Sequence, residues 1–521
     1  MIEINPPLPA TPPRETLVDR IRANAKSHPE RLALVCGDKV RTWEEFDHSV
    51  NRIANLVLRE AGQGTNIAIL SPNSIPYAEL FNGILRAGCC VVPLSTMAAP
   101  DALEKMLKDC DAKAVFVAEQ YLELVGPFIA EMGLKRYSID FDAADFTSLE
   151  EAMAQCPITD PMIEIQMTDP LNLIYSSGTT GTPKGIVQNH AMRAAQMDRV
   201  TPNGYDDNAR TLLSTPLYSN TTLVSFFPTL YGGSTVYLMP KFDARGYLEL
   251  VEKYKITHTM LVPVQYKRIM DIPEFDTFDL TSMRVKFSTS APLRADVKRD
   301  VLARFPGKLI EFYGLTEGGG VCILVADENP TKLHTVGRPG PGNDVRLIDA
   351  EGHEVALGEV GEIVGRGPTM MAGYYGRDDL TADYIWKDAQ GTIYFRSGDM
   401  GSFDAEGFLT LSDRKKDMII SGGLNIFAND LELALLADSD VTDAAVIGVP
   451  SEAWGETPLG LVVLRAGADR TVEDIRADAN ARLGKSQRLS AIEIRQSLPR
   501  STIGKILKRD LRAPYWTNAS E

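Results

Sequence analysis

The sequence lacks the features that would assign the protein to a membrane, a secretion route or a nucleic acid. No uninterrupted apolar run reaches the roughly 18 residues that span a bilayer. The proline-rich start, MIEINPPLPATPPRETL, has no apolar segment of the kind that a secretory signal contains. Basic residues are the minority, 54 against 70 acidic residues, and the resulting net charge of −16 argues against a duplex-binding protein. We therefore expect a cytoplasmic protein with no nucleic-acid partner.

Cysteine is also scarce. The six cysteines stand at positions 36, 89, 90, 110, 156 and 322, and no spacing between them resembles a metal knuckle or a disulfide framework. We expect most of them to be buried apolar side chains in a reducing compartment.

The length and the order of the apolar runs predict several structural units. A chain of 521 residues is too long for one core, because a domain usually has about 100–200 residues. Strand-like runs such as NIAIL (66–70) and LNLIYS (171–176) alternate with helical segments, one of which opens with a capping box, Thr42 to Glu45. This alternation predicts parallel sheets with right-handed helical crossovers, an α/β fold.

The pattern of residue types changes twice in the last third of the chain. Residues 335–415 contain short alternating runs rich in glycine and valine, which predict antiparallel strands and a small β-barrel-like subdomain. After residue 417, a series of helical and strand-like segments predicts a compact α+β unit of about 100 residues. We therefore expect a large N-terminal domain, 1–413, with two doubly wound α/β subdomains, and a small mobile C-terminal domain, 414–521.

The segment YSSGTTGTPKG (175–185) combines hydroxyls, glycines and one lysine directly after the apolar run LNLIYS. Ligands bind at the carboxyl ends of parallel strands, and glycines let backbone N–H groups face an anion. The segment therefore predicts a phosphate-binding loop. The residues expected to bind phosphate are Ser176, Ser177, Gly178, Thr179, Thr180, Gly181 and Lys184.

Two other interpretations of this segment are less favoured. A flexible Ser/Thr/Gly linker would not follow a buried strand and lead into a helix. The Walker A spacing fails, because Pro183 precedes Lys184 and Gly185 follows it.

Five segments in order resemble the adenylate-forming enzymes, the superfamily of acyl- and aryl-CoA synthetases, peptide-synthetase adenylation domains and firefly luciferase. They are YSSGTTGTPKG (175–185), FYGLTE (312–317), YFRSGD (394–399), LSDRKKDMIISGGLNI (411–426) and PRSTIGK (499–505). Ser397 stands where threonine is common in the family. The resemblance covers essentially the whole chain.

The resemblance implies a first half-reaction in which a carboxylate attacks the α-phosphate of ATP. Glu317, with Thr180, would hold Mg²⁺, Thr316 would contact phosphate, and Lys505 would neutralise charge between the carboxylate and the α-phosphate. The nucleotide would be bound by residues from several motifs: Ser290, Ala291, Pro292, Tyr313 and Gly314 at adenine, and Asp399 and Arg414 at ribose or phosphate.

In the second half-reaction a thiol, usually that of CoA, displaces AMP. The resemblance implies that the C-terminal domain turns about a hinge at Lys416, where many relatives have aspartate. Gly422 and Gly423 would then line the tunnel for the pantetheine arm. Lys241 resembles a lysine that contacts a CoA phosphate, although an exposed lysine is the simpler interpretation.

The segments 216–222, 287–290 and 317–325 line the acyl pocket in the family. The residues expected there are Tyr218, Ser219, Ser288, Gly318 and Gly319, and Ser219 replaces the histidine that often gates the pocket. The glycines at 318–320 indicate either space for a bulky acyl group or a tight turn with positive φ. No arginine or lysine lies in these segments, so we expect an apolar or aromatic monocarboxylate rather than a dicarboxylate.

The favoured function is acid–CoA ligation with ATP, Mg²⁺ and CoA. Three alternatives remain: a stand-alone enzyme that loads the phosphopantetheine of a carrier protein, a luciferase-type oxygenase, and a nucleotide-binding scaffold without catalysis. A homodimer and a protein acetyltransferase that modifies Lys505 are further partners to test; acetylation would remove the lysine's charge and stop adenylation.

Overall fold

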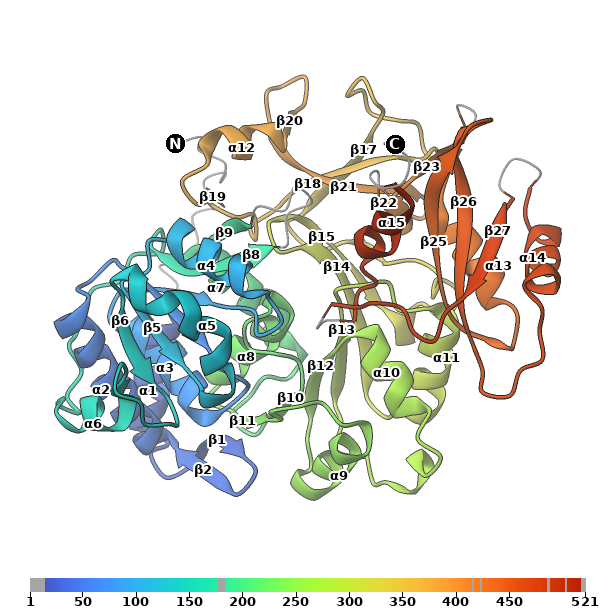
Figure 1. Ribbon diagram of the computed structural model, residues 1–521. Coiled ribbons are helices and arrows are strands. Elements are labelled where there is room, and N and C mark those ends of the chain that lie inside the picture. Colours follow the sequence, from blue (N-terminus) through green and yellow to red (C-terminus); the bar gives the residue numbers. More distant parts are fainter. Residues whose placement is uncertain are drawn as a thin grey trace. The chain divides into compact units, whose positions relative to one another are not determined.

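The computed structural model describes residues 15–176, 183–414, 417–421, 424–484, 488–501 and 504–516. It divides into two compact units (Figure 1). The first comprises residues 1–344 and 365–395, and the second comprises residues 345–364 and 396–521. These two units do not test the predicted boundary between an N-terminal domain, 1–413, and a C-terminal domain, 414–521, which stays a prediction.

The first unit contains an eight-stranded sheet, called here the N-terminal sheet, of order β19-β9-β8-β4-β3-β5-β6-β7. Strands β3 to β8 are neighbours in parallel, as the alternating pattern predicted, and β9 and β19 add antiparallel pairs at one edge. Its strands are β3 (Asn66–Leu70), β4 (Cys90–Pro93), β5 (Ala114–Val117), β6 (Lys135–Ser138), β7 (Thr147–Ser148), β8 (Pro170–Ser176), β9 (Lys184–Asn189) and β19 (Gly373–Tyr374).

A nine-stranded sheet, called here the central sheet, has the order β16-β15-β14-β13-β12-β10-β11-β1-β2. Its middle strands are parallel, and β15 with β16 at one edge and β2 at the other are antiparallel. Its strands are β1 (Leu32–Cys36), β2 (Lys39–Thr42), β10 (Arg210–Leu213), β11 (Thr235–Leu238), β12 (His258–Leu261), β13 (Val285–Ser288), β14 (Lys308–Leu315), β15 (Gly318–Val325) and β16 (Arg338–Pro339).

Helices pack on both sheets, and one large apolar core lies between the two sheets. The largest apolar cluster joins residues of α1, α2, α3 and α8 to strands of both sheets, while α4 and α5 pack on the N-terminal sheet and α9, α10 and α11 pack on the central sheet. The capping box of α2 forms as predicted, between Thr42 and Glu45. The helices are α1 (Leu17–Ser27), α2 (Trp43–Glu60), α3 (Ile75–Arg86), α4 (Pro100–Asp109), α5 (Leu122–Ile129), α6 (Leu149–Ala154), α7 (His190–Val200), α8 (Asn220–Tyr231), α9 (Ala244–Tyr254), α10 (Pro263–Met270), α11 (Ala295–Arg304) and α12 (Asp378–Asp383).

The second unit is β-rich, with a core between its long antiparallel hairpin and helices α13 and α14. Strands β17, β18, β21 and β22 confirm the predicted antiparallel region, and β20 (Ile385–Lys387) pairs with the start of β21 within the first unit. Its elements are β17 (Asp344–Ile348), β18 (Gly361–Arg366), β21 (Ile393–Phe403), β22 (Leu409–Arg414), β23 (Ile419–Ser421), β24 (Leu424–Ile426), α13 (Ala428–Leu436), β25 (Val441–Ser451), β26 (Gly455–Leu464), α14 (Val472–Ala481), β27 (Ala491–Ile494) and α15 (Lys508–Trp516).

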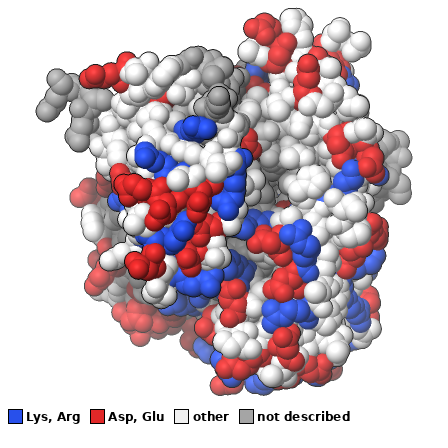
Figure 2. All heavy atoms as spheres, turned by 90° about the vertical axis from the view of Figure 1, so that its right-hand side faces the viewer, with Lys and Arg blue, Asp and Glu red and all other residues white. Residues whose placement is uncertain are grey.

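The distribution of surface charges and the state of the cysteines can be compared with what the composition predicted. On the face drawn in Figure 2, acidic and basic side chains are interspersed, and neither sign forms a continuous patch. All six cysteines are free, and five of them are buried. Within the described part of the chain, no helix is both long enough and apolar enough to cross a bilayer.

Burial of His190 at the start of α7 predicts acid sensitivity. Burial lowers the pKa of this imidazole to about 4, so the unfolded chain takes up the proton first as the pH falls below 6.5. The folded state therefore loses stability between pH 6.5 and pH 4. We expect the free energy of unfolding to fall by about 2 kcal/mol more in the wild type than in His190→Gln when the pH drops from 7.5 to 5.0.

Urea unfolding at the two pH values measures this difference. Carboxylates and His258, whose pKa burial also lowers, contribute equally to both proteins and cancel. An equal pH dependence in wild type and variant would contradict the burial argument.

Candidate active site

Thr316 and Glu317 form the two-residue turn of the β14–β15 hairpin, in which Leu315 pairs with Gly318. Neither turn residue has a positive φ, so the left-handed position falls on Gly318, with φ of 77°. Glycine adopts this left-handed conformation readily because it has no Cβ. The hairpin therefore presents the two predicted phosphate- and metal-binding residues at its tip.

The three glycines that follow serve packing and backbone geometry. Gly318, Gly319 and Gly320 all have positive φ, of 77°, 77° and 92°. A Cβ at Gly318 would overlap the carbonyl oxygen of Thr369, and one at Gly319 would lie 2.6 Å from Cβ of Phe395. Of the two interpretations of the triple glycine, the structure supports the tight turn. A role of Gly318 and Gly319 in acyl binding stays a prediction.

Three hydrogen bonds from neighbouring segments hold this turn. Gln188 Nε2 on β9 donates to the Thr316 carbonyl oxygen at 2.7 Å, and the Met371 amide donates to the Glu317 carbonyl oxygen at 2.8 Å. The Tyr374 hydroxyl on β19 donates to Glu317 Oε1 at 3.0 Å. Burial and the nearby Glu317 carboxylate raise the pKa of Tyr374, so its hydroxyl keeps the proton that it donates.

Gln188 is itself oriented by a buried cation, Arg193 of α7. The guanidinium donates to Gln188 Oε1, Asn172 Oδ1, Gln196 Oε1 and Asn220 Oδ1. Because Arg193 occupies the carbonyl oxygen of the Gln188 carboxamide, the NH₂ end is the one that faces Thr316. Arg193 is fully buried, and burial lowers its pKa to about 9, so it stays charged at neutral pH.

Lys184 lies beside the same turn. Its ammonium donates to the Tyr384 hydroxyl at 2.7 Å and lies 5.6 Å from the ring centroid of Tyr374, the residue that binds Glu317. The structure thus brings together Lys184 and Glu317, two predicted residues that are far apart in sequence, through tyrosines that the sequence motifs did not identify. A cation and a carboxylate beside each other suit binding of a polyphosphate and its metal ion.

The predicted adenine-binding segment is fixed by a buried ion pair. The Leu293 amide, next to Pro292, donates to Glu311 Oε1 at 2.7 Å, and Glu311 pairs with Lys298 of α11. Both charged side chains are 2% exposed. Glu311 shares strand β14 with Tyr313 and Gly314, so the two predicted adenine-contacting segments are tied to one strand.

Ser290 in that segment has a strained backbone. Its φ of 80° is rare for a residue with a side chain, and its hydroxyl hydrogen-bonds with that of Thr221 on α8. Strained residues of this kind concentrate at functional sites. Ala291 and Pro292 follow it directly.

In the second unit, the structure brings Asp399 and Arg414 together. They are directly paired on the antiparallel strands β21 and β22, and Asp399 is buried. The Ser397 hydroxyl donates to the Ile363 carbonyl oxygen at 2.7 Å and accepts from the Asp399 amide at 3.0 Å. A hydroxyl at position 397 therefore orients the backbone of Asp399, and serine supplies it as threonine would.

Lys505 follows a tight turn in the second unit. The Ser501 amide donates to the Lys505 carbonyl oxygen at 2.8 Å, and the Lys505 amide donates to Ser501 Oγ at 3.1 Å. Gly504 has a φ of 76°, and its carbonyl oxygen accepts from Arg500, which is also paired with Asp443. Hydrogen bonds of Ser501 and Gly504 thus fix the backbone from which the Lys505 side chain starts.

Two hydroxyls of the predicted acyl segments are buried without hydrogen-bond partners among the described residues: those of Tyr218 and Ser288. A buried hydroxyl without a partner is costly, so each is suited to a ligand or an ordered water. Ser219 is the N-cap residue of α8 but makes no capping bond through its side chain. Lys241 is exposed.

Several predicted residues lie outside what the structure describes. They are the side chains of Ser176 and Arg414, and all of Ser177, Gly178, Thr179, Thr180, Gly181, Lys416, Gly422 and Gly423. Their predicted roles stay predictions. Strand β8 ends at Ser176, directly before residues 177–182, and the phosphate-binding role of that segment stays a prediction.

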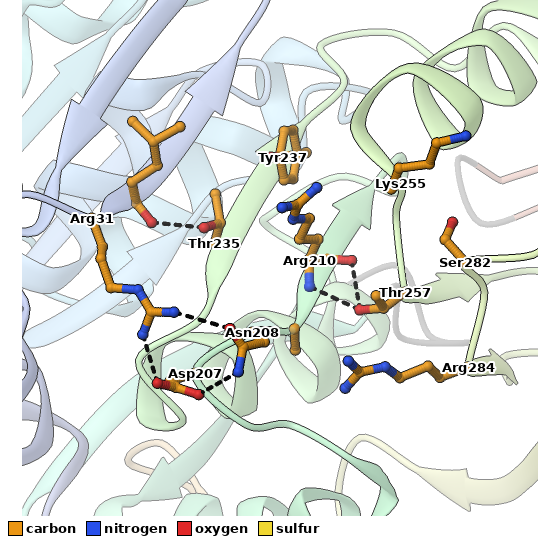
Figure 3. Close-up of a pocket in the computed structure, with 12 residues that line it drawn as sticks. Arg31, Asp207, Asn208, Arg210, Thr235, Tyr237, Lys255, Thr257, Ser282 and Arg284 are labelled. Carbon is orange, nitrogen blue, oxygen red and sulfur yellow. Dashed lines mark hydrogen bonds and ion pairs between the residues drawn. The ribbon is translucent and has the colours of Figure 1, made fainter.

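A hollow of about 720 Å³ lies elsewhere, at the amino ends of β10, β11 and β13 (Figure 3). Its cations already have partners: Arg31 pairs with Asp207, Arg284 with Asp206, and Lys255 with Asp279. In α/β proteins the site is at the carboxyl ends of the strands, and these charges are satisfied within the protein. This hollow is therefore separate from the candidate active site.

Comparisons with known proteins identify the family of this chain. The family described as AMP-binding enzyme matches residues 21–375, and its C-terminal domain matches residues 430–505. The chain belongs to this AMP-binding enzyme family. Its curated relatives place it in the acyl- and aryl-CoA synthetase branch of the adenylate-forming enzymes.

Two relatives and one solved structure illustrate the match. A feruloyl-CoA synthase from an Amycolatopsis species is 33% identical over 94% of this chain and 97% of its own. A 4-coumarate–CoA ligase from Vanilla planifolia is 32% identical over 94% of this chain and 92% of its own. The ATP-bound crystal structure of MatB from Rhodopseudomonas palustris has a TM-score of 0.87 and 26% identity, covering 96% of this chain and 98% of that one.

Gly318→Ala tests the geometry of the turn. The added Cβ would overlap the Thr369 carbonyl oxygen and would be strained by the positive φ, so we expect a loss of about 3 kcal/mol or more. The matched control is Gly133→Ala, where φ is 66° and nothing lies within 4 Å of the new Cβ, so the loss should be about 1 kcal/mol. Urea unfolding of both variants measures the difference, and equal losses would refute the close approach.

Proposed function

We propose that the protein is an ATP-dependent acid–CoA ligase that joins an apolar or aromatic carboxylic acid to CoA in two steps. The observation that carries the proposal is the Thr316–Glu317 turn, which hydrogen bonds from β9 and β19 hold beside Lys184. The relatives named as CoA ligases support this choice over carrier-protein loading, which is not favoured.

In the first step, a carboxylate oxygen of the acid attacks the α-phosphorus of ATP. A P–O bond forms, the bond to the bridging oxygen breaks, and pyrophosphate leaves with the electron pair. Both reactants are anions, so cations must reduce their repulsion. Lys184 and the phosphate loop would bind the polyphosphate, and Thr316 would add a contact to it.

The residues present fit a magnesium ion held mainly by the substrate. Glu317 offers a carboxylate oriented by Tyr374, and no cluster of three or more metal-binding side chains is found among the described residues. Mg²⁺ is commonly held by one or two carboxylates together with substrate phosphates, and it would neutralise phosphate charge there. Glu317, with Thr180, is the proposed ligand set.

The remaining nucleotide contacts divide between adenine and ribose. Tyr313 would stack on adenine against the Ser290–Pro292 segment. Asp399 would accept from the ribose hydroxyls, and Arg414, its partner across β21 and β22, would bind ribose or phosphate oxygens. Lys505 would stabilise the charge that builds between the carboxylate and the α-phosphate.

In the second step, the CoA thiolate attacks the acyl carbonyl carbon and a C–S bond forms. The C–O bond that joins the acyl carbon to the phosphate breaks, and AMP leaves with the electron pair and the bridging oxygen. We propose that residues 414–521 form a C-terminal domain that turns about Lys416 between the steps. Gly422 and Gly423 would then admit the pantetheine arm, and Lys241 would contact a CoA phosphate.

Lys505→Ala separates the two steps. We expect acid-dependent pyrophosphate release to fall by 10³-fold or more, because the cation is lost where charge develops. Turnover of supplied acyl-AMP with CoA should stay within about threefold of wild type. The control, Lys105→Ala, removes an exposed lysine of α4 and should change neither step.

The assay combines protein, ATP, Mg²⁺ and a panel of acids, with and without CoA. Release of AMP that requires CoA supports ligation, whereas acid-dependent exchange of pyrophosphate without CoA turnover points to carrier loading. An equal loss of both steps in Lys505→Ala would contradict the assigned role of the lysine. No exchange with any acid would overturn the proposed function.

A further inference from the structure

Two tyrosines surround the ammonium of Lys184, and one of them, Tyr384, has no role in the proposed mechanism. The ammonium donates to the Tyr384 hydroxyl at 2.7 Å and lies 4.7 Å from the centroid of the Tyr384 ring. It lies 5.6 Å from the centroid of Tyr374, whose ring meets that of Tyr384 edge to face at 5.7 Å and 67°. One hydroxyl and two aromatic rings therefore set the direction of the lysine.

Stacking and hydrogen bonds hold Tyr384 in place. It directly follows α12, and its ring stacks on Phe395 of β21 with centroids 5.6 Å apart and an interplanar angle of 8°. The Tyr374 amide donates to Thr381 Oγ1 at 3.0 Å, and this hydroxyl donates in turn to the Arg377 carbonyl oxygen at 2.9 Å. Thr381 thus ties α12 to β19, so the two tyrosines are kept at a fixed separation.

The same aromatic side chains reach the turn that carries Glu317. Phe395 fits against the turn because residue 319 is glycine, where a Cβ would lie 2.6 Å from that of Phe395. Tyr374 makes a second connection, because its hydroxyl donates to Glu317 Oε1 at 3.0 Å. The cation and the proposed metal ligand are therefore oriented by one connected set of aromatic residues.

A neutral hydroxyl is a suitable partner for a lysine that must bind phosphate. An ammonium has three N–H donors, and the hydrogen bond to Tyr384 uses one of them, which leaves two for phosphate oxygens. A carboxylate in the same place would cancel the charge of the lysine, whereas a phenol hydroxyl leaves it intact. Because a lysine side chain loses much rotamer freedom when it is ordered, one that is ordered in advance binds its ligand more tightly.

We propose that Tyr384 is a positioning residue that orders the Lys184 ammonium for the β- and γ-phosphates of ATP. The α-phosphate is left to Lys505, as in the first step above. The assignment rests on the proposed function and adds to it a residue that lies outside the five sequence motifs. A purely structural hydroxyl would instead stabilise the fold and leave the affinity for the phosphate chain unchanged.

The first test removes the hydroxyl and measures the binding of two nucleotides by calorimetry in the presence of Mg²⁺. The probes are α,β-methylene-ATP, which cannot be cleaved at the α-phosphate, and AMP, which lacks the β- and γ-phosphates. We expect Tyr384→Phe to raise the dissociation constant of α,β-methylene-ATP about tenfold and that of AMP less than twofold. An equal loss for both nucleotides, or no loss for either, would overturn the proposal.

Tyr375→Phe is the matched control, because it removes a hydroxyl from a half-buried tyrosine of the same segment. The Tyr375 hydroxyl accepts from Asn66 Nδ2 at 3.1 Å. We expect both dissociation constants to stay within twofold of wild type in this variant, and the melting temperatures of the two variants to agree within about 2 °C. A tenfold loss of α,β-methylene-ATP affinity in Tyr375→Phe as well would contradict a specific role of Tyr384.

The second test asks whether Tyr384 acts through Lys184. In a Lys184→Met background, we expect Tyr384→Phe to change the dissociation constant of α,β-methylene-ATP less than twofold, because the ammonium that the hydroxyl orders is absent. In the otherwise wild-type enzyme, Tyr384→Phe should raise the KM for ATP about tenfold and leave kcat within about threefold. A further tenfold loss in the Lys184→Met background, or a fall in kcat alone, would overturn the proposal.

Binding of a nucleotide requires no acid, which separates the role of Tyr384 from the proposed function. If no acid supports pyrophosphate release, the ligase function fails, and the two dissociation constants still decide the role of Tyr384. If acids are activated but Tyr384→Phe binds α,β-methylene-ATP as tightly as wild type, the ligase function stands and the role of Tyr384 fails. Failure of the wild type to bind α,β-methylene-ATP would also overturn that role.

Discussion

The candidate site depends on a hydrogen-bond relay from a buried cation to the turn that carries Glu317. Arg193 occupies the carbonyl oxygen of Gln188, so the NH₂ group of that carboxamide is directed at the Thr316 carbonyl oxygen. Gln188 belongs to the N-terminal sheet and Thr316 to the hairpin of the central sheet, so this hydrogen bond ties the two sheets together at the candidate site. Without a fixed Gln188, the backbone of the turn would lose one of its three holding bonds, and the Glu317 carboxylate would lose its fixed position.

Close packing also leaves little space around the turn. Thr369 and Phe395 of β21 lie so close to the hairpin that side chains at Gly318 and Gly319 would collide with them. The close approach also brings the Met371 amide and the Tyr374 hydroxyl to Glu317, so the packing that requires these glycines also positions Glu317. In the hollow at the opposite ends of the central strands, Arg31, Lys255 and Arg284 are each paired with an aspartate of the protein.

The sequence was sufficient for the features that short-range patterns encode. Alternating strands and helices predicted the parallel sheets, the capping box at Thr42 fixed the start of α2, and motif order identified Asp399 and Arg414, which prove to be paired across two strands. It was insufficient where the contact is long-range. Gln188 and Thr316 are 128 residues apart, Leu34 of β1 pairs with the distant Val236 of β11, and no local pattern marks Tyr374 as the residue that binds Glu317. These side chains gain their roles only when the sheets are brought together.

A crystal structure of the protein with a non-hydrolysable ATP analogue and Mg²⁺ tests the account most directly. The account predicts the phosphate chain beside residues 176–184 and the Thr316 backbone, a metal ion within about 2.1 Å of a Glu317 oxygen, and adenine against Tyr313. A nucleotide bound elsewhere, for example in the hollow lined by Arg210 and Arg284, would contradict it.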